Sequence, residues 1–249
     1  MKVWPRKSKG SWGASHMYHW VAQNPVRAVY QFLKTTGKVA GVCLCLMIWS
    51  GLILGSIADK CSAQSKWATP AQIEGPYYPK TKPEEIDSNL LKIGKQELAE
   101  GMPLKLEGKI FDQKGRPIVG AKIEIWQCDN NGIYNHPKAP NRDRFDSRFQ
   151  GFGSSLTDLE GYFGFLTIMP VADHKRPPHI HVKIYRENRE ALTTQLYLKD
   201  HPENNRDGLL SLMLYPGQKK LLIDPIPSKL DHGLKGQSAW FDFVLAKNF

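Results

Sequence analysis

Short segments in which apolar and polar residues alternate characterise the chain from Gly101 onward. Residues 104–110 alternate in this way, and so do residues 121–126. A period of two is typical of a β-strand with one buried face, because successive side chains of a strand point to opposite sides. Residues 112–117, which lie between the two segments, contain Asp, Gly and Pro and are typical of a turn. We therefore predict that the two strands form a hairpin.

Four more segments, rich in β-branched and aromatic residues and bounded by turn-forming residues, follow: residues 162–168, 179–185, 192–198 and 240–245. Six or more short strands without a convincing amphipathic helix indicate an all-β fold, an antiparallel β-sandwich. Residues 101–249 suffice for one hydrophobic core, so we expect one sandwich domain over this range. Residues 128–155 are rich in Asn, Asp, Gly, Pro and Arg and predict one long surface loop.

The segment before the sandwich differs in composition. Residues 64–100 contain many prolines and a charged stretch. Proline fixes its own backbone torsion and disfavours a helical residue before it, so extended structure is favoured over helix. We predict a proline-rich linker and arm here.

The first part of the chain has the pattern of an export signal. Residues 1–38 contain seven Lys or Arg and no Asp or Glu, whereas residues 39–58 are uncharged and mostly apolar. Twenty helical residues rising 1.5 Å each span about 30 Å, the thickness of the hydrocarbon core of a bilayer. We predict a hydrophobic helix within residues 1–63. It acts as a signal anchor, or as a signal peptide that is cleaved after Ala63.

Basic residues before an apolar segment stay on the cytoplasmic side of a membrane. We therefore expect the sandwich to be exported, either as a periplasmic protein or anchored in the membrane through residues 39–58 if the segment is not cleaved. The basic segment supplies most of the net charge of +10. The rest of the chain is close to neutral, so its charge gives no support for nucleic acid as a partner.

The segment beginning at His179 carries the clearest chemical signal. In a strand, His179 and His181 fall on one face, and Ile180 and Val182 on the other. Two imidazoles placed in this way can bind one metal ion without distortion of the backbone. Tyr134, earlier in the chain, could add a phenolate, a hard anionic ligand that favours ferric iron.

Further motifs accompany these residues in a fixed order. They are Glu-Gly-Pro-Tyr-Tyr-Pro (74–79), Gly-Arg-Pro-Ile-Val-Gly-Ala (115–121), Ile-Trp-Gln-Cys-Asp through Gly-Ile-Tyr (125–134), Phe-Gln-Gly-Phe-Gly (149–153), Arg-Pro-Pro-His-Ile-His (176–181) and Leu-Thr-Thr-Gln-Leu-Tyr (192–197). In content and order, the motifs resemble those of the intradiol ring-cleavage dioxygenases, the family of catechol and protocatechuate 3,4-dioxygenases. The resemblance covers most of residues 74–200, and the family's fold is similar to transthyretin-like sandwiches.

The resemblance implies an activity and a site. The expected reaction cleaves a catechol ring with O2 to a cis,cis-muconate-type diacid, and the expected cofactor is one non-haem ferric ion, Fe(3+), per chain. The implied metal ligands are Tyr134, His179 and His181. The implied substrate residues are Arg176, which would stabilise negative charge, Gln195 in the same pocket, and Tyr77 and Tyr78 at its mouth. Since family members often pair their subunits, homo-oligomerisation is a further expectation.

One position departs from the family pattern. Ungapped alignment of residues 167–176 places Asp173 where the family has its second tyrosine ligand. Three interpretations follow. Asp173 replaces the tyrosine as a metal ligand and base; His174 turns inward to give three histidines and one tyrosine; or the two histidines and one carboxylate form a set suited to ferrous iron.

Because of this departure, the sequence is compatible with more than one class of function. We expect an active catechol dioxygenase. The alternatives are a degenerate, non-catalytic extracytoplasmic binding module of the same fold and a structural envelope protein that uses the sandwich for assembly. Failure of a folded protein to bind iron would favour the binding module, and turnover of catechol would exclude the structural protein.

Overall fold

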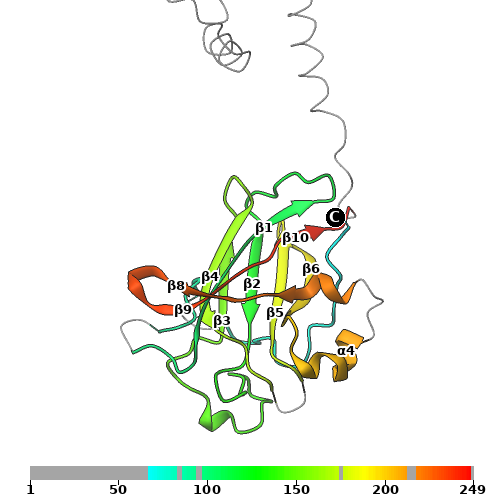
Figure 1. Ribbon diagram of the computed structural model, residues 1–249. Helices are drawn as coiled ribbons and strands as arrows, with labels where there is room; N and C mark the ends of the chain where they lie inside the picture. Colours follow the sequence, from blue (N-terminus) through cyan, green and yellow to red (C-terminus); the bar gives the residue numbers. More distant parts are fainter. Residues whose placement is uncertain (1–66, 83–85, 94–96, 174–175, 212–216, 248–249) are drawn as a thin grey trace, which may run out of the picture. The chain divides into compact units, whose positions relative to one another are not determined.

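The computed structural model describes residues 67–82, 86–93, 97–173, 176–211 and 217–247. The predicted hydrophobic helix and signal segment lie outside these residues. Within these residues, no helix has the length and apolar character needed to cross a membrane. Two five-stranded sheets form the framework of the structure (Figure 1).

The first sheet has the order β10-β1-β9-β8, with β4 also paired to β1, and the second has the order β3-β2-β5-β6-β7. The strands are β1 (Pro103–Asp112), β2 (Lys122–Trp126), β3 (Phe152–Leu156), β4 (Tyr162–Ile168), β5 (His179–Arg186), β6 (Arg189–Leu198), β7 (Leu222–Ile223), β8 (Ile226–Lys229), β9 (Lys235–Trp240) and β10 (Phe243–Leu245). The helices, all short, are η1 (Arg142–Arg144), η2 (Pro202–Arg206), α4 (Gly208–Ser211), η3 (Gln218–Leu221) and η4 (Asp231–Gly233).

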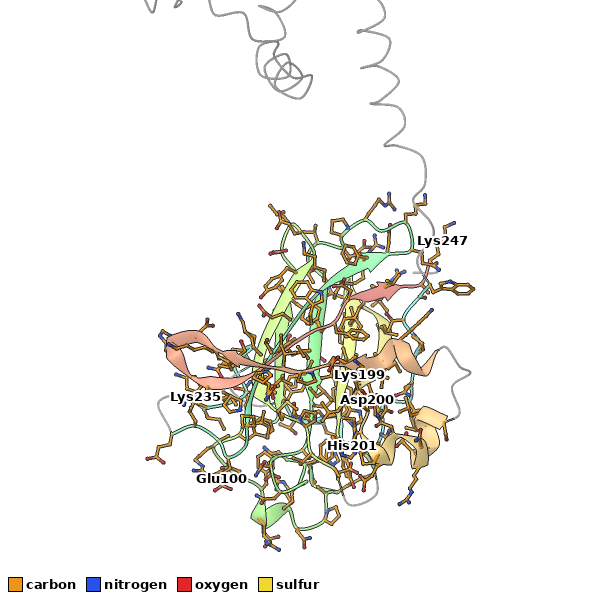
Figure 2. The ribbon with its side chains drawn as sticks, viewed as in Figure 1. Glu100, Lys199, Asp200, His201, Lys235 and Lys247 are labelled. Carbon is orange, nitrogen blue, oxygen red and sulfur yellow. The ribbon has the colours of Figure 1, made fainter. Side chains whose placement is uncertain are left out.

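One hydrophobic core joins the two sheets. Leu104 and Leu106 of β1 are fully buried, as are Ile180 and Val182 of β5, and all four belong to the same cluster. Side chains fill the space between the strands (Figure 2). The predicted all-β sandwich is therefore confirmed. The pairs β1–β9, β1–β10 and β6–β7 are parallel, however, so the sheets are mixed and not purely antiparallel.

The predicted hairpin of residues 104–110 and 121–126 is wrong, because β1 and β2 lie in different sheets. After the turn, the chain pairs with β1 at one isolated bridge, between Phe111 and Pro117. Proline has no N–H to continue a ladder, and β4 pairs with β1 along most of its length. The chain therefore crosses to the second sheet, where β2 pairs with β3 and β5.

The segment predicted as one strand over residues 240–245 is divided between β9 and β10. A Cβ on Gly108 of β1 would lie 1.8 Å from the carbonyl oxygen of Phe241, so the chain can cross β1 closely only at a glycine. Beside this crossing, Asp242 Oδ1 accepts a hydrogen bond from Lys109 N at 3.0 Å. A side chain thus replaces the backbone acceptor, and the ladder is interrupted.

The predicted loop over residues 128–155 ends earlier, because β3 occupies its last part. Gly and Ser have low strand propensity, which explains why the sequence Phe-Gly-Ser-Ser-Leu gave no strand signal. Pairing with β2 nevertheless makes β3 an edge strand. A Cβ on Gly153 would meet Leu90 Cδ1 at 2.5 Å, so the glycine permits close packing of the preceding arm.

The described part of residues 64–100 packs against the sandwich as an arm. Thr69 N donates to Val244 O, and Gln72 N donates to Thr193 O, each at 2.8 Å. Leu90 and Leu91 are fully buried in the core. The arm therefore joins the sandwich at its core and at both sheets.

Candidate active site

The candidate site lies on the face of the second sheet that points away from the shared core. Cross-strand register pairs His181 of β5 with Trp126 of β2 and with Gln195 of β6, and it pairs His179 with Tyr197. Residues directly opposite each other share a face of a sheet. Since Ile180 and Val182 face the core, the two histidines face the arm and the loop after β2, and all five polar and aromatic side chains are buried.

Tyr134 reaches this face through a turn organised by Asp129. The buried carboxylate accepts hydrogen bonds at Oδ1 from Asn131 N at 2.9 Å and from Ile133 N at 3.0 Å. Gly132 within the turn has φ +75°, and a Cβ there would lie 2.7 Å from Ala172 O. The turn needs glycine both for its left-handed conformation and for this close approach.

Three potential metal-binding atoms form a compact triangle. Tyr134 Oη lies 3.1 Å from His179 Nε2 and 3.2 Å from His181 Nε2, and the two Nε2 atoms are 3.0 Å apart. Neighbouring ligands about 2.0–2.1 Å from a metal ion are separated by roughly 3 Å. The triangle therefore has the dimensions of three ligands of one ion.

The protonation of His179 also fits a metal site. Its Nδ1 lies 2.8 Å from Pro177 O and donates to it, so Nε2 carries the lone pair. Burial, reinforced by the positive charge of Arg176, lowers the pKa of His179 to about 4 and keeps the ring neutral at pH 7. Trp126 stacks on His181 with ring centroids 4.7 Å apart and fixes the second imidazole.

The chemistry of the donor set agrees with the geometry. Burial raises the pKa of Tyr134 well above 10.0, so a phenolate at this position needs a compensating positive charge. A metal cation would supply it and would also accept both Nε2 lone pairs. Among the described residues, no three His, Cys, Asp or Glu side chains lie close enough to hold a metal ion. Tyr134 is therefore needed to complete the set.

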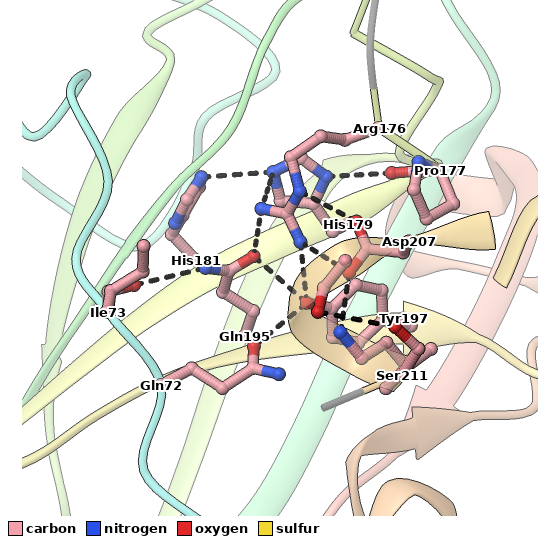
Figure 3. A network of polar contacts seen from close by, with 12 residues as sticks. Gln72, Ile73, Arg176, Pro177, His179, His181, Gln195, Tyr197, Asp207 and Ser211 are labelled. Atoms are coloured by element: carbon pink, nitrogen blue, oxygen red, sulfur yellow. Dashed lines mark hydrogen bonds and ion pairs between the residues drawn. The ribbon is translucent and has the colours of Figure 1, made fainter. Parts of the chain in front are cut away.

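Arg176 is held by a dense hydrogen-bond network (Figure 3). Its Nη1 donates to Gln195 Oε1 at 2.5 Å, and its Nη2 donates to Tyr197 Oη at 2.7 Å. Nη1 also lies 3.5 Å from His179 Nε2, which brings the positive charge next to the histidine pair. Gln195 Nε2 donates to Ile73 O at 3.1 Å, so the network reaches the arm.

Asp207 anchors the guanidinium, and the sequence analysis did not identify it. Arg176 Nε donates to Asp207 Oδ2 at 2.8 Å and Nη2 donates to Oδ1 at 3.2 Å, a bidentate pair. Burial opposes ionisation of Asp207, but the hydrogen bonds from Arg176 outweigh it and lower the pKa. Oδ1 also accepts from Leu210 N at 2.6 Å, as a capping residue of α4. That capping pattern, Asp before Gly-Leu-Leu, was the available sequence signal.

A cavity of about 360 Å³ opens beside the triangle, and we call it the substrate cavity. Its lining includes Tyr77, Tyr134, Asp173, Arg176, His179 and His181. The ring of Tyr77 stacks on that of Tyr134 with centroids 4.6 Å apart. A Cβ on Gly75 would lie 3.4 Å from His181 Cε1, so the arm covers the histidine closely.

The structure brings most of the predicted site residues together. Asp173 lies on the cavity wall, and its carbonyl oxygen accepts a hydrogen bond from Arg176 N at 2.8 Å. It belongs to no three-membered ligand group with the histidines among the described residues, and His174 lies outside these residues. Gln195 is not part of the cavity lining, but it accepts a hydrogen bond from Arg176, which is. Tyr78 points elsewhere and donates to Glu124 Oε2 at 2.7 Å.

The chain is similar to known dioxygenases. A family model described as dioxygenase matches residues 73–173. The dioxygenase domain of a dioxygenase carbohydrate-binding protein fusion from Streptomyces sp. SirexAA-E is 31% identical, with a TM-score of 0.56 over 72% of this chain and 98% of that domain. An intradiol ring-cleavage dioxygenase from Tetranychus urticae, 23% identical with a TM-score of 0.57, covers 74% of this chain and 97% of its own and shares the fold.

Curated relatives of this chain are also dioxygenases. Catechol 1,2-dioxygenase of Acinetobacter baylyi is 29% identical over 178 residues, which are 64% of this chain and 54% of the relative. The β chain of protocatechuate 3,4-dioxygenase from Burkholderia cepacia is 31% identical over 126 residues, 47% of this chain and 52% of the relative. The chain spans a little over half the length of the curated relatives it matches, from 54% to 63% for three catechol 1,2-dioxygenases.

Proposed function

Since this chain belongs to the intradiol ring-cleavage dioxygenase family, we propose that it cleaves a catechol with O2 between the two hydroxyl-bearing carbons. Both oxygen atoms enter the product, a muconate-type diacid. The triangle of Tyr134 Oη, His179 Nε2 and His181 Nε2, at the edge of a cavity that also contains Arg176, carries this proposal.

Tyr134, His179 and His181 would hold one ferric ion. When bound, the ion would supply a Lewis acid for the oxygen atoms of the catechol and would lower the electron density of its ring. Ferric iron suits this donor set because the phenolate is a hard anion. The two imidazoles, which burial keeps neutral, would add two nitrogen donors without adding charge.

The remaining residues would act on the substrate. Arg176, held by Asp207, stabilises negative charge that develops on the ring oxygens, and a fixed guanidinium needs no reorganisation during the reaction. The apolar wall formed by Ile73, Ile133 and Pro140 suits the flat faces of an aromatic ring. Asp173, which lines the same cavity, would accept a proton from a catechol hydroxyl, in the role that the second tyrosine of the family pattern leaves open.

Iron content and the visible spectrum of the purified full-length chain, before and after addition of catechol, test this function. We expect near-stoichiometric iron, a tyrosinate charge-transfer band, a shift of the band with catechol, and then loss of catechol with uptake of O2. A matched protein with His179→Ala and His181→Ala should be colourless.

A folded, iron-free protein would contradict the proposal and would favour the second candidate, a non-catalytic binding module. Two points support that candidate. The ungapped alignment puts Asp173 where the family pattern has its second tyrosine, and Asp173 forms no three-membered ligand group with the two histidines among the described residues. Catechol binding without turnover would be its signature.

We also propose that the protein is exported. Twenty uncharged, mostly apolar residues (39–58) follow a segment with seven positive charges and none negative, the pattern that directs the following domain across a membrane. Protease digestion of intact cells or spheroplasts should degrade the sandwich, whereas a cytoplasmic marker survives. Protection of both proteins until lysis would contradict export.

A further inference from the structure

A second cavity, of about 280 Å³, adjoins the substrate cavity, and we call it the basic cavity. Tyr77 and Tyr134 line both cavities, so this stacked pair is part of the wall they share. The arm supplies Lys80 and Lys82 to the lining, and the loop after β2 supplies His136 and Arg142. The proposed ring cleavage uses only the substrate cavity.

The basic cavity has an unbalanced positive charge. Its lining contains three cationic side chains and, among the described residues, no Asp or Glu. Lys82 Nζ pairs at 2.5 Å with Oε1 of Glu124, a residue outside the lining. Lys80 and Arg142 have no ion-pair partner in the described part of the chain, and the guanidinium of Arg142 donates only to a neutral acceptor, Asn135 Oδ1, at 3.2 Å. The two free positive charges favour an anionic ligand.

Unsatisfied polar atoms are concentrated in the same lining. In the described residues, five buried side-chain polar atoms have no hydrogen-bond partner, and three of them belong to Trp126, His136 and Gln150. Such atoms are uncommon, because leaving a buried donor or acceptor unpaired costs about 1–3 kcal/mol.

The chemistry of these three atoms is defined by their neighbours. The indole Nε1 of Trp126 is always a donor. His136 Nδ1 accepts a hydrogen bond from Lys138 N at 3.1 Å, so Nε2 carries the hydrogen and is a second donor. Gln150 Nε2 donates to Phe152 O at 2.7 Å, which leaves Oε1 as an acceptor. The lining thus offers two donors and one acceptor besides its charges.

We propose that the basic cavity binds a small hydroxylated carboxylate. Lys80 and Arg142 would neutralise the carboxylate, the N–H groups of Trp126 and His136 would donate to its oxygens, and Gln150 Oε1 would accept from the hydroxyl. Small shifts of these side chains would bring the three buried atoms into contact with the ligand. This site is separate from the iron site, and it binds its ligand whether or not the chain cleaves catechol.

Calorimetric titration of the full-length chain with malate, at constant ionic strength, tests the proposal. Succinate is the matched probe, because it lacks only the hydroxyl group. The test variant combines Lys80→Gln with Arg142→Gln. The control combines Lys114→Gln with Arg144→Gln, which removes the same charge from exposed positions outside the lining.

We expect saturable binding of malate, a dissociation constant at least about tenfold weaker in the test variant, and no comparable change in the control. Absence of saturable binding to the unmodified chain would overturn the proposal. Equal weakening of malate binding in both variants would show only a diffuse effect of charge and would overturn the proposal. Unchanged binding in the test variant would show that malate binds outside the basic cavity, for example at the iron, and would also overturn it. Equal affinity for malate and succinate would overturn the role of Gln150.

Discussion

At the scale of single residues, Asp173 is the position where we predict a departure from the family pattern. The carboxylate lies on the wall of the substrate cavity, beside Arg176 and the buried histidines. It can therefore serve as a proton acceptor even though it forms no ligand group with the histidines among the described residues.

We expect Asp173→Ala to lower kcat by roughly 10²–10⁴-fold, the contribution typical of a general base, while iron content stays unchanged. Asp173→Tyr should strengthen the tyrosinate absorption band. Single-turnover kinetics and metal analysis of both variants are the measurements. Native kinetics in Asp173→Ala would remove the residue from the mechanism.

Asp207 determines the position of Arg176, so its removal should affect both stability and turnover. Asp207→Ala leaves a largely buried guanidinium without its partner, and we expect a loss of about 3 kcal/mol in the free energy of unfolding. Asp207→Asn should retain iron but lower kcat more than it raises KM. Asp143→Asn, in an exposed 3-10 helix, is the control for urea denaturation and kinetics.

The stabilisation that the Asp207–Arg176 ion pair contributes should depend on pH. The pKa of Asp207 is lowered in the folded protein from 3.8, so its stabilisation is complete above this value and is lost as pH falls through the folded-state pKa. We expect the difference in unfolding free energy between the unmodified chain and Asp207→Asn to be constant near neutral pH and to shrink below about pH 4. A difference that persists unchanged to pH 2 would contradict the ion pair.

At the scale of elements, the turn between β2 and η1 presents Tyr134 to the histidines on β5. Gly132 lies in this turn, and Gly120, which lies between β1 and β2 and has a similar torsion, serves as a comparison that separates backbone strain from steric contact. Gly132 has φ +75° and a Cβ there would lie 2.7 Å from Ala172 O, whereas Gly120 has φ +68° and nothing within 4 Å.

We expect Gly120→Ala to cost about 1 kcal/mol through its torsion alone. Gly132→Ala should cost more, because backbone must also move away from Ala172, and it should reduce iron binding by displacing Tyr134. Urea denaturation and iron titration of both variants measure the two effects. Equal stability and equal iron affinity would show that the close approach is unimportant.

The sequence pattern predicted which face of a strand each residue occupies, but it did not predict which strands pair. The alternation of β5 correctly placed His179 and His181 on the face opposite Ile180 and Val182, because local periodicity alone decides the face. The pairing partners of β1 and β2 were predicted wrongly. Partner choice depends on distant segments, here β4, β9 and β10, which occupy both sides of β1.

At the scale of the whole molecule, the site is assembled from the arm, the loop after β2, and strands β5 and β6. Iron binding to Tyr134, His179 and His181 should therefore stabilise the entire fold. A ligand that binds only the folded state at one hundred times its dissociation constant adds about 2.7 kcal/mol.

We expect ferric iron to raise the thermal unfolding temperature of the chain, and a chelator to reverse the rise. In the double variant His179→Ala and His181→Ala, the unfolding temperature should not respond to iron. A similar response in both proteins would indicate iron bound elsewhere on the surface.

Local periodicity was enough to predict the all-β class and the face shared by His179 and His181, and the order of short motifs was enough to predict the family. The departure at Asp173 stays a prediction. Three further features follow from the folded structure and not from the sequence pattern: Asp207 holds Arg176, Tyr78 turns toward Glu124, and a basic cavity adjoins the substrate cavity. These features join residues that are distant along the chain. The free energy of such contacts comes from burial and charge pairing in three dimensions, and neither leaves a periodic signal in the sequence.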